Sequence, residues 1–278
     1  MQTWTLGDVK ITALLEQQVA LPCDFLLPAA TAAEVQAIDW LAPAYATGAA
    51  ELILWIQAFV LETPTRRIVV DTCMGNDKPR TGLPDTDFLQ RFEAAGFPRE
   101  SLDTVLCTHL HNDHVGWNTR LEDGRWVPTF PNARYLIGKA EHGHWSQNLE
   151  GDDALILQQS VEPLLDAKLV DLVESDHRIC DEVRLVPTPG HTPGHVSVSI
   201  ESQGRRGIIT GDMIHNPAQI ARPEWASFVD YDSEAGVATR RRVLEGLADQ
   251  PTLVLGTHFP EPTGGAIVRD GAGYRFKA

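Results

Sequence analysis

The densest group of potential metal ligands in the sequence lies in the segment 109–114, which reads HLHNDH. An extended backbone turns His109 and His111 to the same side, where both side chains can bind one metal ion. Asp113 and His114 follow on the predicted turn and can reach a second ion. Because three imidazoles and a carboxylate rarely fall so close together by chance, the segment predicts a metal site.

Three later segments each place a potential ligand directly after an apolar run. His191 lies in the loop TPGHTPGH, Asp212 follows the apolar residues 207–209, and His258 follows residues 252–255. Proline and glycine make the loop around His191 stiff and sharply turned. Since each of these side chains comes at the end of a predicted strand, we expect them to converge on one edge of the fold.

The elements that position these ligands are predicted by short runs rich in branched and aromatic residues. Strands are predicted in two blocks, at residues 9–15, 52–61, 67–70, 104–107 and 133–137, and at residues 183–186, 196–200, 207–209, 252–255 and 274–276. Helices are predicted at residues 86–95, 153–165 and 233–248. Continuously apolar strands are typical of sheets covered on both faces. The pattern predicts a layered α/β fold that forms a single domain over residues 1–278.

The charge of the chain argues against a polyanionic partner. The 278 residues include 23 Lys and Arg against 38 Asp and Glu, which gives a formal net charge of −15. The densest basic run, Arg240-Arg241-Arg242, falls in a predicted helix and is interpreted as a solvated helix face. We therefore expect a small-molecule substrate and no nucleic acid.

Other features of the sequence bear on the cellular location of the protein and on its cysteines. The first residues lack the pattern of a signal peptide, and no apolar run approaches the ~18 residues that a membrane span needs. We expect a soluble, cytoplasmic protein that does not bind membranes. The cysteines form no C-x-x-C pair and are expected to be reduced packing residues; they are Cys23, Cys73, Cys107 and Cys180.

The order of these motifs resembles that of the metallo-β-lactamase superfamily of metallohydrolases, over roughly residues 50–260. The matching features are the H-x-H-x-D-H segment, His191, Asp212 and His258, in that order along the chain. The resemblance implies a four-layer αββα sandwich with two similar halves, which agrees with the layered fold predicted from the apolar runs.

The resemblance also assigns seven metal ligands by position. Those of the first ion are His109, His111 and His191, those of the second are Asp113, His114 and His258, and Asp212 bridges the two. Ligands with only nitrogen and oxygen donors suit zinc, and iron and manganese are the alternatives. We therefore expect two divalent metal ions, with zinc as the first choice.

Two further residues match family positions next to the metal ligands. Asp71, at the end of the apolar residues 68–70, resembles the aspartate that orients a ligand histidine. The alternative for Asp71 is a turn cap. His195, four residues after His191, resembles a companion histidine beside the site, and a structural role is its alternative.

The resemblance implies hydrolysis, with a metal-bridging hydroxide attacking the carbonyl of a lactone or a related ester. Residues 71–76 and 211–215 resemble the branch that contains lactonases and organophosphate hydrolases. Lactonases of this branch commonly have a tyrosine three residues after the bridging aspartate, where this chain has His215. We predict that His215 contacts a substrate oxygen or ring, and a structural hydrogen bond is the alternative. The candidate catalytic residues are Asp113, Asp212 and His215.

Apolar side chains outside the strands are candidates for the substrate pocket. Phe25, Trp117 and Trp225 are predicted to line it and to favour a hydrophobic acyl or aryl group, and ordinary core packing is the alternative. Because lactonases of the family are often dimers, a homodimer is a further expectation.

Other functions remain open within the same family. The substrate is alternatively an aryl ester, a thioester of the glyoxalase II type or a phosphotriester. A mononuclear iron persulfide dioxygenase is a different reaction class, which a count of bound metal ions would separate from a dinuclear hydrolase. A non-catalytic binding module disagrees with the intact set of seven ligands.

Overall fold

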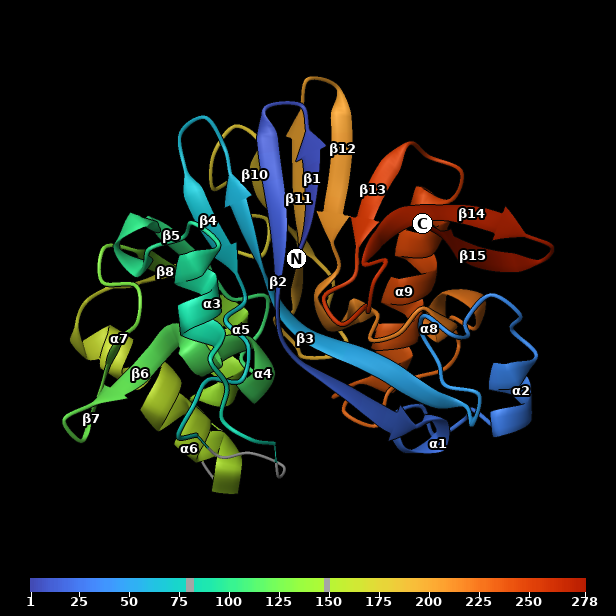
Figure 1. Cartoon of the computed structure of the whole chain (residues 1–278), viewed down its shortest axis with the longest axis horizontal. Helices are drawn as coiled ribbons and strands as arrows, with labels where there is room; N and C mark the ends of the chain where they lie inside the picture. The colour runs from blue at the N-terminus through green and yellow to red at the C-terminus, as the bar shows by residue number, and fades with distance from the viewer. Residues whose placement is uncertain (79–82, 148–150) are drawn as a thin grey trace.

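The computed structural model describes residues 1–78, 83–147 and 151–278, and over these residues the chain forms two large sheets that pack face to face (Figure 1). The order of the seven-stranded sheet is β1 (Gln2–Leu6), β2 (Val9–Pro22), β3 (Glu51–Glu62), β4 (Arg67–Val70), β5 (Thr104–Leu106), β8 (Arg134–Gly138) and β9 (Val170–Val173). The order of the six-stranded sheet is β10 (Val183–Pro187), β11 (Val196–Ser202), β12 (Arg205–Ile209), β13 (Thr252–Leu255), β14 (Gly264–Asp270) and β15 (Gly273–Lys277).

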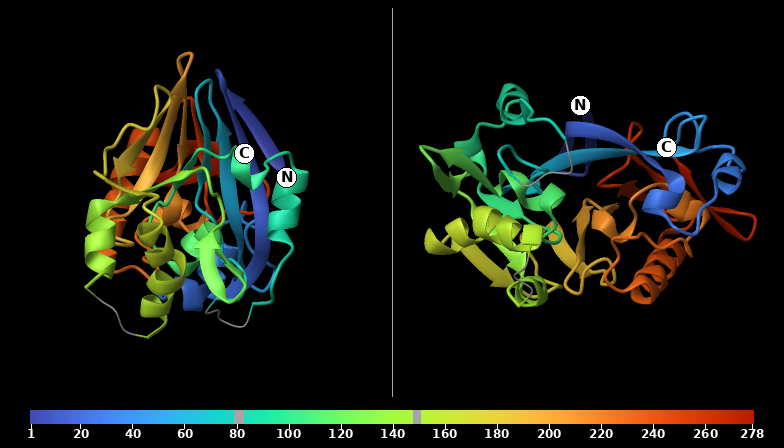
Figure 2. Two further views of the ribbon diagram at one scale, coloured as in Figure 1. Left: turned by 90° about the vertical axis from the view of Figure 1, so that its left-hand side faces the viewer. Right: turned by 90° about the horizontal axis from the view of Figure 1, so that it is seen from below.

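Helices cover the outer faces of both sheets, and Figure 2 shows the same layers from the side and from below. Beside the first sheet lie α3 (Phe88–Ala94), α4 (Asn112–Val115), α5 (Lys139–Trp145), α6 (Gly151–Ser160), α7 (Glu162–Asp166) and the hairpin of β6 (Thr119–Glu122) and β7 (Arg125–Pro128). Beside the second sheet lie α1 (Cys23–Leu26), α2 (Ala32–Gln36), α8 (Ala218–Ala221) and α9 (Ser233–Leu247). The predicted αββα sandwich is confirmed.

Three buried apolar clusters hold the layers together. The central cluster joins the two sheets, with Phe59 and Leu106 from the first and Val198 and Leu255 from the second. The other two clusters fill the space between each sheet and its helices. Burial on both faces explains why the central strands are continuously apolar in the sequence.

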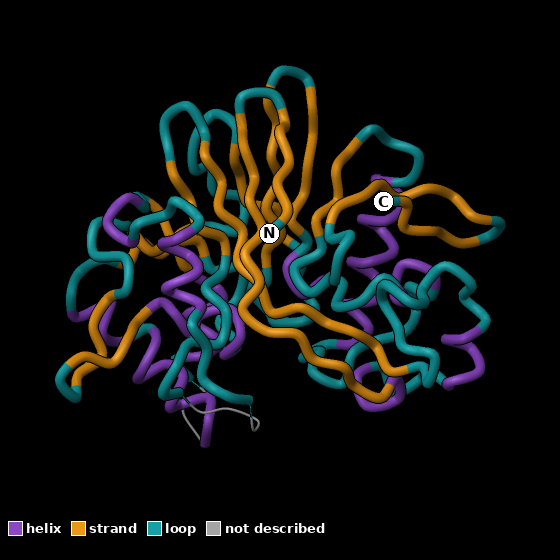
Figure 3. Tube along the Cα trace, viewed as in Figure 1, coloured by secondary structure: helices purple, strands orange, loops and turns teal. Residues whose placement is uncertain are grey.

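The ribbon formed by β2 and β3 is longer than predicted and extends beyond the first sheet toward α1 (Figure 3). Its register shifts between Leu15 and Gln17, so that Glu16 turns inward and is buried. The Glu16 carboxylate accepts hydrogen bonds from the Met74 N–H at 2.7 Å and from Trp117 Nε1 at 2.7 Å. The bulge therefore ties the ribbon to the segment after β4 and to the segment that follows the HLHNDH motif.

The sequence and the structure differ in the helices. The helix predicted at residues 153–165 is two helices, α6 and α7, because the chain breaks at Val161. Arg240, interpreted as part of a solvated face, is 1% exposed because α9 packs this side against the loops that follow β12. Its neighbours Arg241 and Arg242 are exposed as predicted.

The remaining global predictions concern cysteines and membrane spans. All four cysteines are free, and three of them are buried. Among the described residues, no helix combines the length and apolarity needed to cross a bilayer.

The backbone next to the HLHNDH motif is packed so closely that a methyl group at Gly116 has no space. A Cβ at this position would lie 1.9 Å from the backbone C and O of Met74. We expect Gly116→Ala to lower the free energy of unfolding by on the order of 3 kcal/mol, measured by urea denaturation. Gly246→Ala in α9 is the matched control, because a Cβ there meets nothing within 4 Å and helix propensity favours alanine by about 1 kcal/mol. Equal stability of Gly116→Ala and the unmodified chain would contradict this packing argument.

Candidate metal centre

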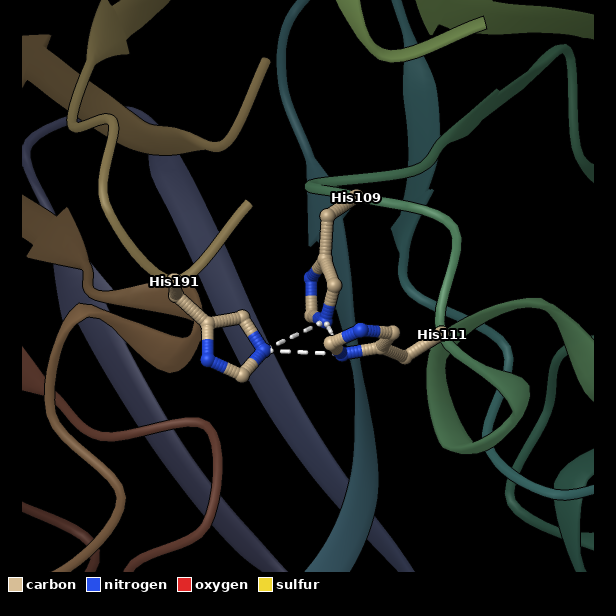
Figure 4. Close-up of side chains that lie close together, drawn as sticks. All are labelled: His109, His111 and His191. Atoms are coloured by element: carbon tan, nitrogen blue, oxygen red, sulfur yellow. Dashed lines mark hydrogen bonds between the residues drawn. The ribbon is translucent and has the colours of Figure 1, made fainter. Parts of the chain in front are cut away.

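Three histidine rings from two loops point their nitrogens at one another (Figure 4). His191 Nε2 lies 2.8 Å from His111 Nδ1 and 3.2 Å from His109 Nε2, and the latter two nitrogens are 3.0 Å apart. Two nitrogens bound at ~2.0–2.1 Å to one tetrahedral zinc ion lie about 3.3 Å apart. The spacing of this first triad, His109, His111 and His191, therefore fits one metal ion.

A second triad lies beside the first and consists of Asp113, His114 and His258. His258 Nε2 is 3.3 Å from His114 Nε2. The Asp113 carboxylate lies 3.7 Å from His114 Nε2 and 3.5 Å from His258 Nε2. Both histidines are buried while the Asp113 side chain is 24% exposed, so this carboxylate faces the opening of the site.

The Asp212 carboxylate stands between the two triads. Its Oδ1 lies 3.2 Å from His114 Nε2 and 3.1 Å from His258 Nε2. Its Oδ2 lies 3.5 Å from His191 Nε2, 3.9 Å from His109 Nε2 and 3.3 Å from His258 Nε2. Oδ1 is buried, and both of its neighbours are imidazole nitrogens, which are themselves metal-ligand atoms. A buried carboxylate oxygen in such surroundings suits a cation. The donor set therefore fits two divalent ions bridged by Asp212.

The charge states of these groups follow from burial and from one another. Burial lowers the pKa of His109 and of His191 well below the usual value, so both rings are neutral and their lone pairs are free for a metal ion. Burial opposes ionisation of Asp212, but His114 and His258 hold its pKa well below the usual range. Burial also opposes the charged form of His114, yet Asp212 and other carboxylates raise its pKa well above the usual value.

Strand ends bring these side chains together. Residues 109–114 follow β5, His191 follows β10, and His258 follows β13. Asp212 lies in the 3-10 turn Gly211–Met213 after β12, and β12 pairs in parallel with β13, so both strands end at the same edge. The convergence on one edge that the sequence predicts is what the structure shows.

Residues around the triads fix the orientation of the rings. Asp71 Oδ2 lies 2.9 Å from His114 Nδ1, and Thr108 donates its N–H and its hydroxyl to the same carboxylate. His195 accepts the Asp212 N–H on Nε2 at 2.8 Å, which leaves the ring proton on Nδ1 to be donated to Thr188 O at 3.0 Å. Asp71 and His195 therefore lie behind the ligands and do not face the metal positions.

Sequence reasoning missed Glu141, a buried carboxylate in α5. Its Oε1 accepts the Leu110 N–H at 3.1 Å and Trp145 Nε1 at 2.6 Å, and its Oε2 accepts the Thr192 hydroxyl at 2.8 Å and the Gly194 N–H at 3.0 Å. Glu141 thus joins the loop of His109 and His111 to the loop of His191.

Asp230 is a second buried carboxylate that sequence reasoning missed, and its carboxylate lies 3.1 Å from His191 Nδ1. Nothing in the sequence separates these two carboxylates from the chain's other acidic residues.

A cavity of about 590 Å³ opens onto the two triads. Phe25 and His215 line it, as do Leu54 and Ile56 of β3. Trp117 and Trp225 do not line it, which corrects the sequence prediction. Both are buried in the apolar clusters under the helices, because their indole rings fill the space behind the loops of the site.

The chain belongs to the metallo-beta-lactamase superfamily, since residues 56–258 match the family of that description. The family resemblance predicted from the sequence is confirmed. At the level of class, the chain is a metal-dependent hydrolase.

Among its relatives, an N-acyl homoserine lactonase of Bacillus sp is 26% identical over 235 residues, which cover 78% of this chain and 86% of that protein. An N-acyl homoserine lactonase of Bacillus cereus is 25% identical over 234 residues, again covering 78% and 86%.

Two solved structures share the fold over nearly the whole chain. The crystal structure of hydrolase AbOPH in the beta lactamase superfamily is 27% identical, has a TM-score of 0.83, and the match covers 99% of this chain and 96% of that one. AidC, a dizinc quorum-quenching lactonase in complex with a product, is 20% identical with the same TM-score and coverage, and at this identity it shows the fold alone.

Proposed function

We propose that this chain is a dinuclear metal-dependent hydrolase that opens a lactone or cleaves a related carboxylic ester. The observation that carries the proposal is the Asp212 carboxylate, which lies between two ligand triads and within 3.5 Å of imidazole nitrogens from both. The first triad would hold one ion and the second triad the other, with zinc preferred and iron or manganese as alternatives. A second complete triad favours this reaction over a mononuclear iron dioxygenase.

Two bound divalent ions would supply a nucleophile from water at neutral pH and polarise the carbonyl that is attacked. The residues of the two triads and Asp212, most of them buried, would hold these ions. Asp113 is the ligand whose carboxylate is partly exposed to the cavity. Its position places it next to a substrate that enters the cavity, which supports its assignment as a catalytic residue together with Asp212.

The lining of the cavity supports a substrate with a neutral, apolar acyl or aryl group. Leu54 and Ile56 form part of one wall, and the rings of Phe25 and Phe228 approach to 4.8 Å between centroids at the other side. Among the described lining residues there is no Lys or Arg, so none of these side chains carries a permanent positive charge for an anionic recognition group.

The proposal also covers domain organisation, location and oligomeric state. The two sheets share one central core, which supports a single domain over residues 1–278. A cytoplasmic location and a homodimer stay predictions from the sequence and from the family.

The proposal is tested by assaying the purified chain, with and without zinc, against acyl homoserine lactones, other lactones, aryl esters, thioesters and phosphotriesters. We expect lactones or carboxylic esters with apolar acyl groups to be the best substrates. A chelator should abolish turnover and zinc should restore it. No metal-dependent hydrolysis of any lactone or ester would contradict the proposal, and a preference for phosphotriesters would support the alternative hydrolase.

His215 is proposed to donate a hydrogen bond to the substrate. Its side chain is 4% exposed, and its Nε2 lies 3.4 Å from Asp212 Oδ2. Both ring nitrogens are buried, and neither makes a hydrogen bond with the described residues. The backbone N–H of His215 donates to Gln219 Oε1 at 2.8 Å, which fixes the residue, and the ring stacks parallel to His258. A buried ring at the wall of the cavity whose nitrogens make no hydrogen bond with the described residues is suited to a ligand oxygen.

We expect His215→Phe to lower kcat/KM on the best substrate by about 10²- to 10³-fold, as does the loss of one donor to a developing oxyanion. Phenylalanine keeps the ring and its packing, so the free energy of unfolding should not fall. His215→Gln, which restores an N–H donor, should recover part of the activity. Unchanged kcat/KM in His215→Phe would contradict the proposed role and favour the structural alternative.

A further inference from the structure

The ring of His191 is oriented by a residue outside the known motifs. His191 Nδ1 lies 3.1 Å from Asp230 Oδ1, and each of the two side chains is 1% exposed. An ionised carboxylate only accepts hydrogen bonds, so Nδ1 carries the ring proton and donates it to Asp230. Nε2 then keeps its lone pair, and this is the atom that faces His109 and His111.

The second carboxylate oxygen of Asp230, Oδ2, also has partners. Asp230 Oδ2 accepts the N–H of Ser227 at 2.9 Å and lies 3.8 Å from Nη2 of Arg240. The positive charge offsets part of the cost of burying the carboxylate. Arg240 thus places a positive charge next to the buried carboxylate of Asp230.

Arg240 is fixed in turn by backbone oxygens. Its Nε donates to Met213 O at 2.9 Å, and its Nη1 donates to Pro223 O at 2.9 Å and to Trp225 O at 3.0 Å. Burial lowers the pKa of Arg240 to about 10, which leaves the guanidinium charged at neutral pH. A guanidinium held at three carbonyl oxygens is a rigid support for the carboxylate.

The loop that carries Asp230 also forms part of the cavity. Phe228 and Val229 line the cavity, and the next residues bond to the His191 loop: the N–H of Tyr231 donates to His191 O at 3.0 Å. On the other side, the N–H of Phe228 donates to Leu26 O at 3.1 Å. One loop therefore contacts both a ligand of the first triad and the apolar wall.

We propose that Asp230, supported by the buried Arg240, is the positioning residue of the first metal site, fixing His191 Nε2 toward His109 and His111. The inference rests on the proposed dinuclear centre and extends it, since it assigns a role to two residues that the motifs of the sequence did not include. Loss of Asp230 should therefore affect only the first metal site, because the second triad is oriented by Asp71 behind His114. Loss of a carboxylate behind a ligand histidine typically weakens metal binding about 10- to 100-fold.

The experiment is a chelator-competition titration of zinc into the metal-free chain, which yields the two dissociation constants. Asp230→Asn keeps the size and the acceptor oxygen of the side chain but removes its charge. We expect one dissociation constant to rise by about 10- to 100-fold and the other to stay within threefold. In a His258→Ala background, which removes a ligand of the second triad, the remaining site should show the same loss when Asp230→Asn is added.

Two arginine variants test whether Arg240 supports Asp230. Arg240→Lys keeps the charge but loses the guanidinium donors, and should weaken the same site to a smaller extent than Asp230→Asn. Arg241→Lys is the matched control, because Arg241 is exposed on the same helix, and both dissociation constants should stay unchanged. If Asp230→Asn does not fold, as judged by circular dichroism of the metal-free chain, Arg240→Lys gives the deciding measurement.

The outcomes separate this inference from the proposed function. If the unmodified chain binds two zinc ions and both substitutions leave both constants unchanged, the positioning role is wrong and the dinuclear centre stands. If both constants change equally, Asp230 acts on general stability and the inference is again wrong. If the unmodified chain binds no zinc, the dinuclear centre itself fails.

Discussion

The buried carboxylate of Asp212 is the constraint on which the rest of the site depends. It is 3% exposed and stands between two groups of imidazoles, with Oδ1 3.2 Å from His114 Nε2 and 3.1 Å from His258 Nε2. An ionised carboxylate at this depth is costly unless positive charge lies next to it. In the metal-free chain, His114 and His258 partly provide that charge. Two divalent ions would supply that positive charge in full. The ring nitrogens of both triads face the Asp212 carboxylate, which fits such a pair of ions.

The fold serves to deliver these groups to a single place. Parallel pairing of β4 with β5 and of β12 with β13 brings strand ends from each sheet to the same edge, and the apolar core between the sheets fixes the distance between them. Behind the ligands, buried carboxylates link one loop to the next. Asp71 orients His114, Glu141 joins two ligand loops, and Asp230 orients His191. The rings are therefore held from outside, which leaves the inner nitrogens free.

The convergence of the candidate ligands could be predicted from the sequence because their signal is local. Several ligands fall within residues 109–114, and the others each follow an apolar strand that is recognisable by itself. The layered fold was predictable for the same reason, since strands buried on both faces read as continuous apolar runs. The extra length of β2 and β3 was not, because their outer part packs on one side only and carries a bulge at Glu16.

Residues whose role comes from tertiary contacts were not predictable. Arg240 has the same sequence context as Arg241, and the direction of α9 decides that one is buried while the other is solvated. Trp117 follows the HLHNDH motif and Trp225 lies outside the predicted strands, yet both side chains are buried in the apolar clusters. Asp230 is likewise defined by contacts that join distant segments of the chain.

The central claim is that Asp212 bridges two metal ions, and anomalous X-ray diffraction from crystals of the zinc-loaded chain tests it most directly. Data collected on both sides of the zinc absorption edge should show two peaks about 3.5–4 Å apart, one at each triad, with Asp212 between them. A single peak, or peaks away from Asp212, would contradict the account.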